Sequence, residues 1–334
     1  MRICMHGAGG LGSLMGAFLA KSGHEVWLVA RPAHVDAVNR GGLQITGITG
    51  EQTIKAGLHA TASIGDIEGP IDLYVLTVKA KDTATALAQA KAAKLDVSMA
   101  MSLQNTVVKD DALIDTFGER PVIGASTIEG ATLLEPGVVR HTATCPTTAY
   151  FGELNGTESD RAHDVTKAFD DAGFASKCVN TIRQVEWEKL LQIATVSPWS
   201  VCTLAAVPWA TVADGMSNRP AAELYVMLAQ DLLRVYQSLG YEPEDYYAPY
   251  SRYRELVSSS FEDAVERVLA QGAMMKANNL VGKTSMHEDV LRGRRTEAPE
   301  VLRPFLDQAQ KAGLDVPVLR TIAQTVFAID ELLE

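Results

Sequence analysis

The sequence contains few cysteines, and they are not arranged as a metal site or a disulfide framework. The four cysteines in 334 residues stand singly, with neither a CxxC pair nor a cysteine–histidine pair at ligand spacing. The seven histidines are scattered as well. We therefore expect no metal centre, and we expect the cysteines to be small core residues in a reducing compartment, the cytoplasm.

The chain also has no excess of positive charge. Lysine and arginine number 30 against 41 aspartate and glutamate, which gives a formal net charge of -11. The sequence offers no basic face that could bind the phosphates of a nucleic acid, so nucleic acid is excluded as the main partner. An anionic small molecule would have to be bound by local cations.

No apolar run is continuous enough to indicate a membrane span. The segment from Leu190 to Ala213 has no charged residue and is long enough to cross a bilayer. Gln192, Pro198, Pro208 and several serines and threonines lower its hydrophobicity. We expect buried helices of a soluble core here, and no membrane association.

The first thirty residues contain a strand, a glycine turn, a helix and a second strand. MRICM is followed by HGAGGLGSLMGAFLAKSG and then HEVWLVAR. Gly7, Gly9 and Gly12 stand in G-x-G-x-x-G register, in which the first allows a tight turn, the second close approach of a pyrophosphate and the third close helix packing. The βαβ unit predicts dinucleotide binding; the alternative is a glycine turn without a ligand.

Two cations follow predicted strands and bear on the choice of cofactor. Arg31 stands nineteen residues after Gly12, where an NAD site carries a carboxylate, and it suits the 2'-phosphate of NADP(H). Lys79 ends the strand IDLYVLTVKAKD, together with Lys81. A solvated surface arginine and solvated loop lysines are the alternatives.

The pattern predicts an α/β fold with an N-terminal Rossmann-type doubly wound sheet, residues 1–180, followed by an all-helical domain, residues 181–334. The first domain continues with a helix at 83–94, the strand VSMAMSLQN, strands near PVIGAST, GVVRHTA and TAYFGEL, and a helix at 158–172. In the second domain we expect helices near 184–195, 219–239, 260–279 and 300–312, the last ending before Gly313. The tyrosine-rich stretch 241–253 is expected to be a connecting loop.

One lysine lies on the apolar stripe of the first helix of the second domain. Val185, Lys189, Ile193 and Val196 share one helical face. Lys189 is expected either to extend its ammonium to solvent, to pair with Glu186, or to project into a cleft between the two domains.

These motifs together resemble the ketopantoate reductase (2-dehydropantoate 2-reductase) family. The matching segments are HGAGGLG, Arg31, Lys79, LQN at 103–105, EPGVV at 135–139, WEKL at 187–190 and SMHEDVLRGRRTE at 285–297. The resemblance implies that Lys189 is the catalytic lysine, that Glu297 is the acid of the pocket, that Ser285 holds the substrate carboxylate, and that Asn105 lies beside nicotinamide and substrate. A surface pair with Arg294 or Arg295 is the alternative for Glu297. The implied cofactor contacts are Gly7, Ala8, Gly9, Gly10, Leu11, Gly12, Arg31, Lys79, Asn105 and Glu297.

The sequence departs from the family pattern in the expected substrate pocket. Ile193 and Ser197 occupy positions, four and eight residues after the lysine, where the family commonly has asparagines. Further departures are Thr106, Gly282, Pro299 and Pro304. Fewer amides mean fewer partners for substrate hydroxyls, so we expect a more apolar 2-oxo acid or ketone around Ile193 and Ser197, with ketopantoate still open.

The predicted activity is NADPH-dependent reduction of a small 2-oxo acid, reversible as a 2-hydroxy-acid dehydrogenase. A nearby ammonium can stabilise and protonate the oxygen that becomes negative when hydride reaches the ketone carbon. The alternatives are a non-catalytic NADP(H)-sensing protein and a Rossmann dehydrogenase for another carbonyl or imine. The apolar helices of the second half are compatible with a homodimer.

Overall fold

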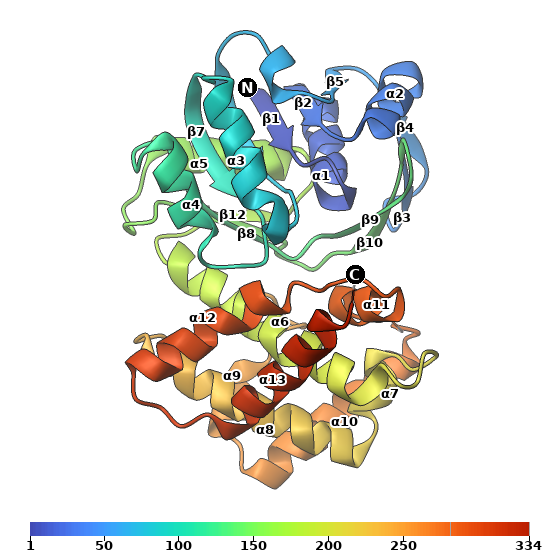
Figure 1. The fold of residues 1–334 in the computed structure, drawn as a ribbon, viewed down its shortest axis with the longest axis vertical. Coiled ribbons are helices and arrows are strands. Elements are labelled where there is room, and N and C mark those ends of the chain that lie inside the picture. The colour runs from blue at the N-terminus through green and yellow to red at the C-terminus, as the bar shows by residue number, and fades with distance from the viewer. Residues whose placement is uncertain (281, 334) are drawn as a thin grey trace. The chain divides into compact units, whose positions relative to one another are not determined.

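The computed structural model describes residues 1–280 and 282–333, and the chain divides into two compact units, Met1–Glu186 and Trp187–Glu334 (Figure 1). The strands of the first unit are β1 (Arg2–His6), β2 (Glu25–Val29), β3 (Leu43–Gly47), β4 (Gln52–Ile54), β5 (Leu58–Thr61), β6 (Ile71–Leu76), β7 (Val97–Ser102), β8 (Gly124–Thr127), β9 (Gly130–Glu135), β10 (Val138–Ala143), β11 (Ala149–Gly152) and β12 (Ser176–Cys178). Its helices are α1 (Gly10–Lys21), α2 (Pro32–Gly41), α3 (Thr83–Ala92), α4 (Lys109–Phe117) and α5 (Asp160–Asp171), with short 3₁₀ turns η1 (Ile64–Asp66) and η2 (Ala80–Asp82).

The first unit is built on a five-stranded sheet in the order β5-β2-β1-β6-β7, with every neighbouring pair parallel. The chain adds β2 and β5 on one side of β1 and then β6 and β7 on the other. The ends of β1 and β6 therefore meet where the winding direction reverses, which is where such sheets bind ligands. The predicted Rossmann-type doubly wound sheet is confirmed.

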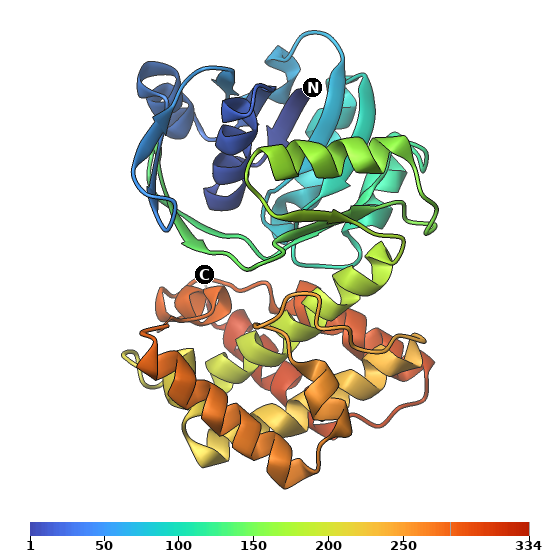
Figure 2. The same cartoon turned by 180° about the vertical axis from the view of Figure 1, so that it is seen from behind.

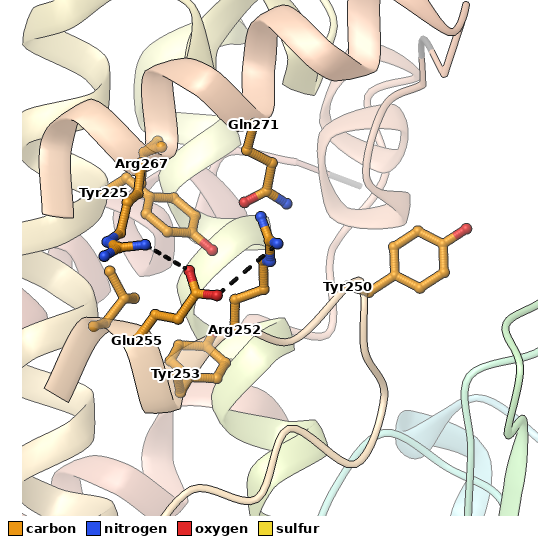
Figure 3. Close-up of a pocket in the computed structure, with 9 residues that line it drawn as sticks. Tyr225, Tyr250, Arg252, Tyr253, Glu255, Arg267 and Gln271 are labelled. Atoms are coloured by element: carbon orange, nitrogen blue, oxygen red, sulfur yellow. Dashed lines mark hydrogen bonds and ion pairs between the residues drawn. The ribbon is translucent and has the colours of Figure 1, made fainter. Parts of the chain in front are cut away.

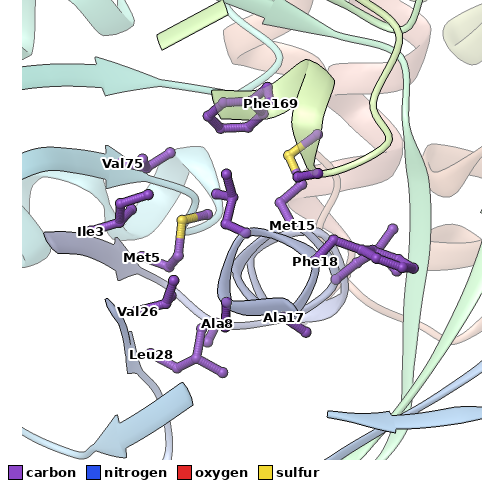
Figure 4. Close-up of a cluster of buried hydrophobic side chains, with 14 of the residues drawn as sticks. Ile3, Met5, Ala8, Met15, Ala17, Phe18, Val26, Leu28, Val75 and Phe169 are labelled. Carbon is purple, nitrogen blue, oxygen red and sulfur yellow. The ribbon is translucent and has the colours of Figure 1, made fainter. Parts of the chain in front are cut away.

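Alternate residues of β1 enter two separate cores, because successive side chains of a strand point to opposite faces. Ile3 and Met5 pack with α1 residues such as Met15 and with Phe169 of α5 (Figure 4). Cys4 packs on the other face with residues of α3 and α4. Both faces of the sheet are covered, which explains why its strands are apolar throughout.

Two smaller sheets complete this unit, and neither was predicted as a sheet. They have the strand orders β4-β3-β10-β9 and β12-β11-β8. The strands expected near PVIGAST, GVVRHTA and TAYFGEL are present as β8, β10 and β11, but their pairing depends on distant partners. Helix α1 contacts β1 and β2 on one side and β9 and β10 on the other (Figure 2).

The second unit is helical. Its helices are α6 (Ile182–Leu204, which begins in the first unit), α7 (Val212–Met216), α8 (Arg219–Ser238), α9 (Tyr253–Ser258), α10 (Phe261–Ala277), α11 (Ser285–Leu291), α12 (Ala298–Lys311) and α13 (Pro317–Glu331). Within the described residues, every helix is too short or too polar to cross a membrane.

One of the helical predictions was wrong in extent. The helix expected at 184–195 continues through Pro198 to Leu204, since Trp199 beyond the proline is fully buried and its Nε1–H donates to the Ala221 carbonyl at 2.7 Å. The helix expected at 300–312 is present as α12, and α13, which follows it, was not predicted. Helices α7, α9 and α11 were also not predicted; each is seven residues or shorter, so its periodic signal is weak.

Candidate functional site

The turn after β1 has the conformation that its first glycine permits. Gly7 has a φ of 110°, and an added Cβ would lie 2.4 Å from the backbone nitrogen of Val78. The amides of Gly7 and Ala8 both donate to the Val29 carbonyl, at 3.1 and 2.9 Å. The turn is therefore held against the ends of β2 and β6 and tolerates no side chain at its first position.

The other glycines of the turn differ in what they face. A Cβ on Gly12 would lie 2.5 Å from Thr77 Oγ1, and one on Gly10 would lie 2.3 Å from the Ala131 carbonyl oxygen of β9. A Cβ on Gly9 would meet nothing nearer than the Gly7 carbonyl at 4.0 Å. Internal packing thus explains Gly10 and Gly12, whereas Gly9 borders space that a bound group can occupy.

Helix α1 starts directly from this turn without a side-chain cap. Its first backbone bond runs from the Ser13 amide to the Gly9 carbonyl, at 3.1 Å. The amides of Gly10, Leu11 and Gly12 precede that bond and belong to the first turn, whose N–H groups have no partner within a helix. Such amides, at the positive end of the helix dipole, attract a phosphate.

The polar side chains predicted for cofactor binding lie at the same edge of the sheet. Arg31 is exposed and begins α2 directly after β2, and Lys79 is exposed and begins η2 directly after β6. Asn105 is half-buried and stands three residues beyond β7. Since β1, β2, β6 and β7 are parallel neighbours, the first unit brings these residues and the glycine turn to one set of strand ends.

Gln104, in the LQN motif, was not singled out from the sequence. Its side-chain Nε2 donates to the Val78 carbonyl at 2.9 Å and to Thr83 Oγ1 at 2.7 Å. It therefore ties the loop that carries Asn105 to the loop that carries Lys79. A glutamine next to a predicted ligand residue was the only signal in the sequence.

In the second unit, one face of α6 carries the predicted catalytic and substrate residues. Lys189 is 8 % exposed, Ser197 is buried and Ile193 is half-buried. Ser200 lies on the same face at helical spacing, and its Oγ is 2.8 Å from Thr284 Oγ1. Thr284 caps α11, whose first residue is the exposed Ser285. The Ser200 end of this face, three turns beyond Lys189, is thus joined to the start of the Ser285 helix.

A second face of α6 anchors the tyrosine-rich segment. Glu188 is buried and accepts hydrogen bonds from the amides of Glu244 and Tyr246, at 2.8 and 2.9 Å, and from the Tyr236 hydroxyl at 3.3 Å. Burial raises the pKa of this carboxyl to about 6, although the bonds that it accepts oppose the rise. The hydrogen bonds of Glu188 therefore fix the position of α6 next to Lys189.

Glu186, one alternative partner for Lys189, accepts hydrogen bonds from other groups. The Lys109 ammonium donates to Glu186 Oε1, and the Ala125 amide donates to the same oxygen at 3.2 Å. Glu186 belongs to a buried cluster with Lys109 and Asp110 in the first unit. It thereby joins the start of α6 to α4 and β8.

The segment that carries Glu297 is fixed by the C-terminal helix. Asp330 of α13 accepts hydrogen bonds from the Thr296 amide and hydroxyl, at 2.8 and 3.1 Å. Glu297 is half-buried and begins α12, where Pro299 stands in the first turn, which tolerates proline. Arg295 donates to the Leu333 carbonyl at 3.2 Å. Pro299 is therefore accommodated at the start of α12, whereas Pro304 stands inside the helix.

His287 was also not singled out. Its side chain is fully buried, and both ring nitrogens lack a hydrogen-bond partner among the described residues. Burial lowers its pKa. It stands two residues after Ser285 in the quoted motif, but no signal in the sequence distinguished it from a packing residue.

A small, open pocket lies in the second unit beside α8, α9 and α10 (Figure 3). Glu255 lies 3.1 Å from Arg267 and 3.9 Å from Arg252, next to Tyr225 and Tyr253. The lining of this pocket includes none of the residues predicted for catalysis or binding. Among the described residues, no group of three or more histidine, cysteine, aspartate or glutamate side chains is placed to hold a metal ion.

Comparison with known proteins assigns both halves of the chain to one family. The family model "Ketopantoate reductase PanE/ApbA" matches residues 3–156, and "Ketopantoate reductase PanE/ApbA C terminal" matches residues 181–330. The 2-dehydropantoate 2-reductase of Archaeoglobus fulgidus is 29% identical over 329 residues, 98% of each chain.

Solved structures share the fold over nearly the whole length. The crystal structure of 2-dehydropantoate 2-reductase from Geobacter metallireducens has a TM-score of 0.79 at 22% identity, covering 98% of this chain and 99% of that one. D-mandelate dehydrogenase, in a ternary structure with NADH and anilino(oxo)acetate, has a TM-score of 0.76 at 19% identity, covering 99% of each chain. The chain belongs to the ketopantoate reductase family of oxidoreductases.

Proposed function

We propose that this protein is an NADPH-dependent reductase that converts the ketone of a small 2-oxo acid into a 2-hydroxy acid, and that the reaction is reversible. The observation that carries the proposal is Lys189, 8 % exposed on the face of α6 that bonds the cap of the Ser285 helix. Family membership and the 2-dehydropantoate 2-reductases among the relatives support the same reaction.

The residues of the first unit fit a nicotinamide dinucleotide. The space beside Gly9 accepts a group that approaches the backbone closely, and the uncapped start of α1 offers amides to a pyrophosphate. Arg31, exposed at the end of β2, suits a 2'-phosphate, which favours NADPH over NADH. Lys79 and Asn105 are proposed to contact the cofactor from the ends of β6 and β7.

In the proposed reaction, a side chain of this protein donates the proton and the cofactor supplies the hydride. Reduced nicotinamide, when bound, supplies the hydride to the ketone carbon. The Lys189 ammonium stabilises the negative charge that develops on the ketone oxygen and donates its proton there. Ser285 bonds the substrate carboxylate, Glu297 orients the lysine and contacts the cofactor, and Asn105 orients the carbonyl.

The substrate is proposed to carry a more apolar side chain than ketopantoate does. Ile193 and Ser197, one and two turns beyond Lys189, present a methyl-rich side chain and a short hydroxyl where amides would bond a substrate hydroxyl. The fold neighbour D-mandelate dehydrogenase, solved with anilino(oxo)acetate, supports an aromatic or branched 2-oxo acid.

The experiment is steady-state turnover of the wild-type chain and of Lys189→Ala, with NADPH and NADH, over a panel of aliphatic, branched, aromatic and hydroxylated 2-oxo acids. We expect NADPH and apolar substrates to be preferred. We expect Lys189→Ala to lower kcat/KM about 100-fold or more, while the Kd of NADPH changes little. Lys311→Ala, an exposed lysine on α12, is the matched control.

Several outcomes would contradict the proposal in distinct ways. Binding of NADPH without turnover of any carbonyl would favour a sensing protein. Equal turnover by Lys189→Ala would remove the proposed role of that lysine. Selective reduction of ketopantoate would contradict the altered substrate preference alone.

A further inference from the structure

Two buried polar side chains near the glycine turn are not used by the proposed mechanism. Ser13 lies on α1 and is 0 % exposed, and His34 lies on α2 and is 3 % exposed. Ser13 Oγ donates to the Ala8 carbonyl at 3.1 Å, and His34 Nε2 lies 3.0 Å from Ser13 Oγ. The Gly137 amide donates to His34 Nδ1 at 3.0 Å. The three contacts form a continuous chain of hydrogen bonds.

The direction of each bond in this chain follows from the Gly137 amide, which can only donate. His34 Nδ1 must therefore be the acceptor nitrogen, so a neutral ring carries its proton on Nε2 and donates it to Ser13 Oγ. The Ser13 hydroxyl is then free to donate to Ala8. Burial lowers the pKa of His34, which favours this neutral form.

This series of hydrogen bonds joins three parts of the first unit. At one end, Ala8 lies within the glycine turn. In the middle, His34 stands one helical turn after Arg31, and its amide donates to the Arg31 carbonyl at 2.9 Å. At the other end, Gly137 lies in the turn between β9 and β10, the hairpin whose Ala131 packs against Gly10.

The Ala8 carbonyl is the part of the turn that a side chain has to hold. The start of the turn is fixed by backbone bonds from Gly7 and Ala8 to Val29. The next peptide, Ala8–Gly9, ends in a glycine that borders open space, and glycine is the residue with the most backbone freedom. The Gly9 amide of this peptide donates to the Gly7 carbonyl at 2.7 Å. Loss of the Ser13 bond therefore leaves the peptide held at its N–H alone, at the position where a pyrophosphate would approach.

We propose that Ser13 and His34 are positioning residues of the dinucleotide site. They hold the Ala8–Gly9 peptide and the start of α2 in the arrangement that receives the cofactor phosphates, so that this arrangement exists before binding. The inference rests on the proposed function, because it requires that the glycine turn binds a nicotinamide dinucleotide. Neither residue contacts the reacting atoms.

The test compares two serine variants on the same helix. Ser13→Ala removes the bond to Ala8, whereas Ser22→Ala removes a bond to the Leu19 carbonyl at the far end of α1. We expect the Kd of NADPH, measured by calorimetry on the full chain, to rise about tenfold for Ser13→Ala and to stay unchanged for Ser22→Ala. The KM for NADPH should rise with little change in kcat.

Two variants of His34 test its hydrogen bond to Ser13 and its hydrogen bond to Gly137 separately. His34→Gln can place an amide N–H near the Nε2 position and keep the bond to Ser13, whereas His34→Asn can place an oxygen near Nδ1 and keep only the bond to Gly137. We expect His34→Gln to bind NADPH nearly as the wild type does and His34→Asn to match Ser13→Ala. The double variant Ser13→Ala/His34→Asn should bind no more weakly than either single variant.

The outcomes distinguish this inference from the proposed function. A wild-type chain that binds neither NADPH nor NADH overturns the proposed function and this inference with it. A wild type that binds NADPH while Ser13→Ala and His34→Asn bind it equally well overturns only the inference. A lower Tm with unchanged Kd in those variants assigns the residues to folding alone and also overturns it. If Ser13→Ala does not fold, the comparison of His34→Gln with His34→Asn decides.

Discussion

At the scale of single residues, Lys109 is a cation that the fold buries almost completely. It is 3 % exposed; its Nζ lies 3.2 Å from Asp110 Oδ1 and bonds Glu186, while Arg183 Nη1 lies 3.0 Å from Asp110 Oδ2. Burial by itself would lower the pKa of Lys109, but the attraction of Asp110 and Glu186 outweighs it and the pKa is raised. The ammonium therefore stays charged between Asp110 and Glu186.

Replacement of this lysine is expected to be costly. Lys109→Met removes the buried ammonium from Glu186 and leaves Asp110 with the part-exposed Arg183. Removal of one partner from such a buried pair costs about 3–5 kcal/mol of unfolding free energy. Lys167→Met, which removes an exposed pair with Asp171 on α5, should change little. Urea unfolding followed by circular dichroism measures both. Similar small losses for the two variants would contradict the buried role.

Residues whose purpose is local could be predicted from the sequence, and residues whose purpose is a distant partner could not. Gly7 and Gly12 belong to one motif of six consecutive residues, so their spacing was informative even though added side chains would meet the distant Val78 and Thr77. Ser13 and His34 acquire their roles only when Gly137, 103 residues beyond His34, is brought beside them. The roles assigned to Lys189, Ser285 and Glu297 came from family resemblance and stay predictions.

At the scale of elements, α13 begins at a cap that lies far away in the sequence. Asp231 Oδ2 of α8 accepts hydrogen bonds from the amides of Val318 and Leu319, at 2.8 and 3.0 Å. The residue before α13, Val316, contributes no capping side chain. A carboxylate at this position satisfies two amides of the first turn and is favoured by the helix dipole.

We expect Asp231→Ala to destabilise the second unit by about 1–2 kcal/mol, because it leaves those first-turn amides without an acceptor. Hydrogen exchange should quicken at the start of α13 before it does elsewhere. Asp231→Asn, which retains an acceptor oxygen, should recover part of the loss. The exposed Asp307→Ala on α12 is the control. Unchanged exchange at α13 in Asp231→Ala would show that the cap is dispensable.

A local cap accompanies some of the helices that sequence reasoning found, but the short helices α7 and α11 also carry their own caps and were missed. Helices α8 and α10 carry their own cap residues, Asn218 and Ser260, and were predicted close to their observed ends. Helix α13 is capped from another helix and was missed. Helix α6 was expected to end before Pro198, but the burial of Trp199 outweighs the hydrogen bond that the proline removes.

At the scale of the whole molecule, two buried carboxyls on α6 link stability to pH. Burial, reinforced by Asp110, raises the pKa of Glu186 to about 8, and burial raises the pKa of Glu188 to about 6. An acid whose pKa is raised on folding binds its proton more tightly in the folded chain. Its contribution is therefore fully present below the unfolded pKa, near 4.5, and is lost as pH rises through the folded pKa.

Buried histidines act in the opposite direction and in a lower range. Burial lowers the pKa of His6 to about 4, so the folded chain favours the neutral ring, and this contribution is lost as pH falls below about 6.5. As pH rises above that value, His6 becomes neutral in both states. The decline expected between pH 6.5 and 8 is therefore assigned to Glu186, which faces Lys109 and Asp110.

The difference between each glutamine variant and the wild type isolates these contributions from the rest of the chain. For Glu186→Gln, the unfolding free energy relative to wild type should rise with pH, by at most about 1.4 kcal/mol per unit, up to about pH 8. For Glu188→Gln, the rise should stop near pH 6, since that carboxylate is ionised above it. Because the two residues are neighbours on one helix, each variant is the control for the other. Urea unfolding at half-unit steps from pH 4.5 to 8.5 measures both differences. If the difference for Glu186→Gln does not change with pH, the Glu186 carboxyl of the wild type is ionised throughout this range. Lys109 would then compensate the burial of that carboxylate in full.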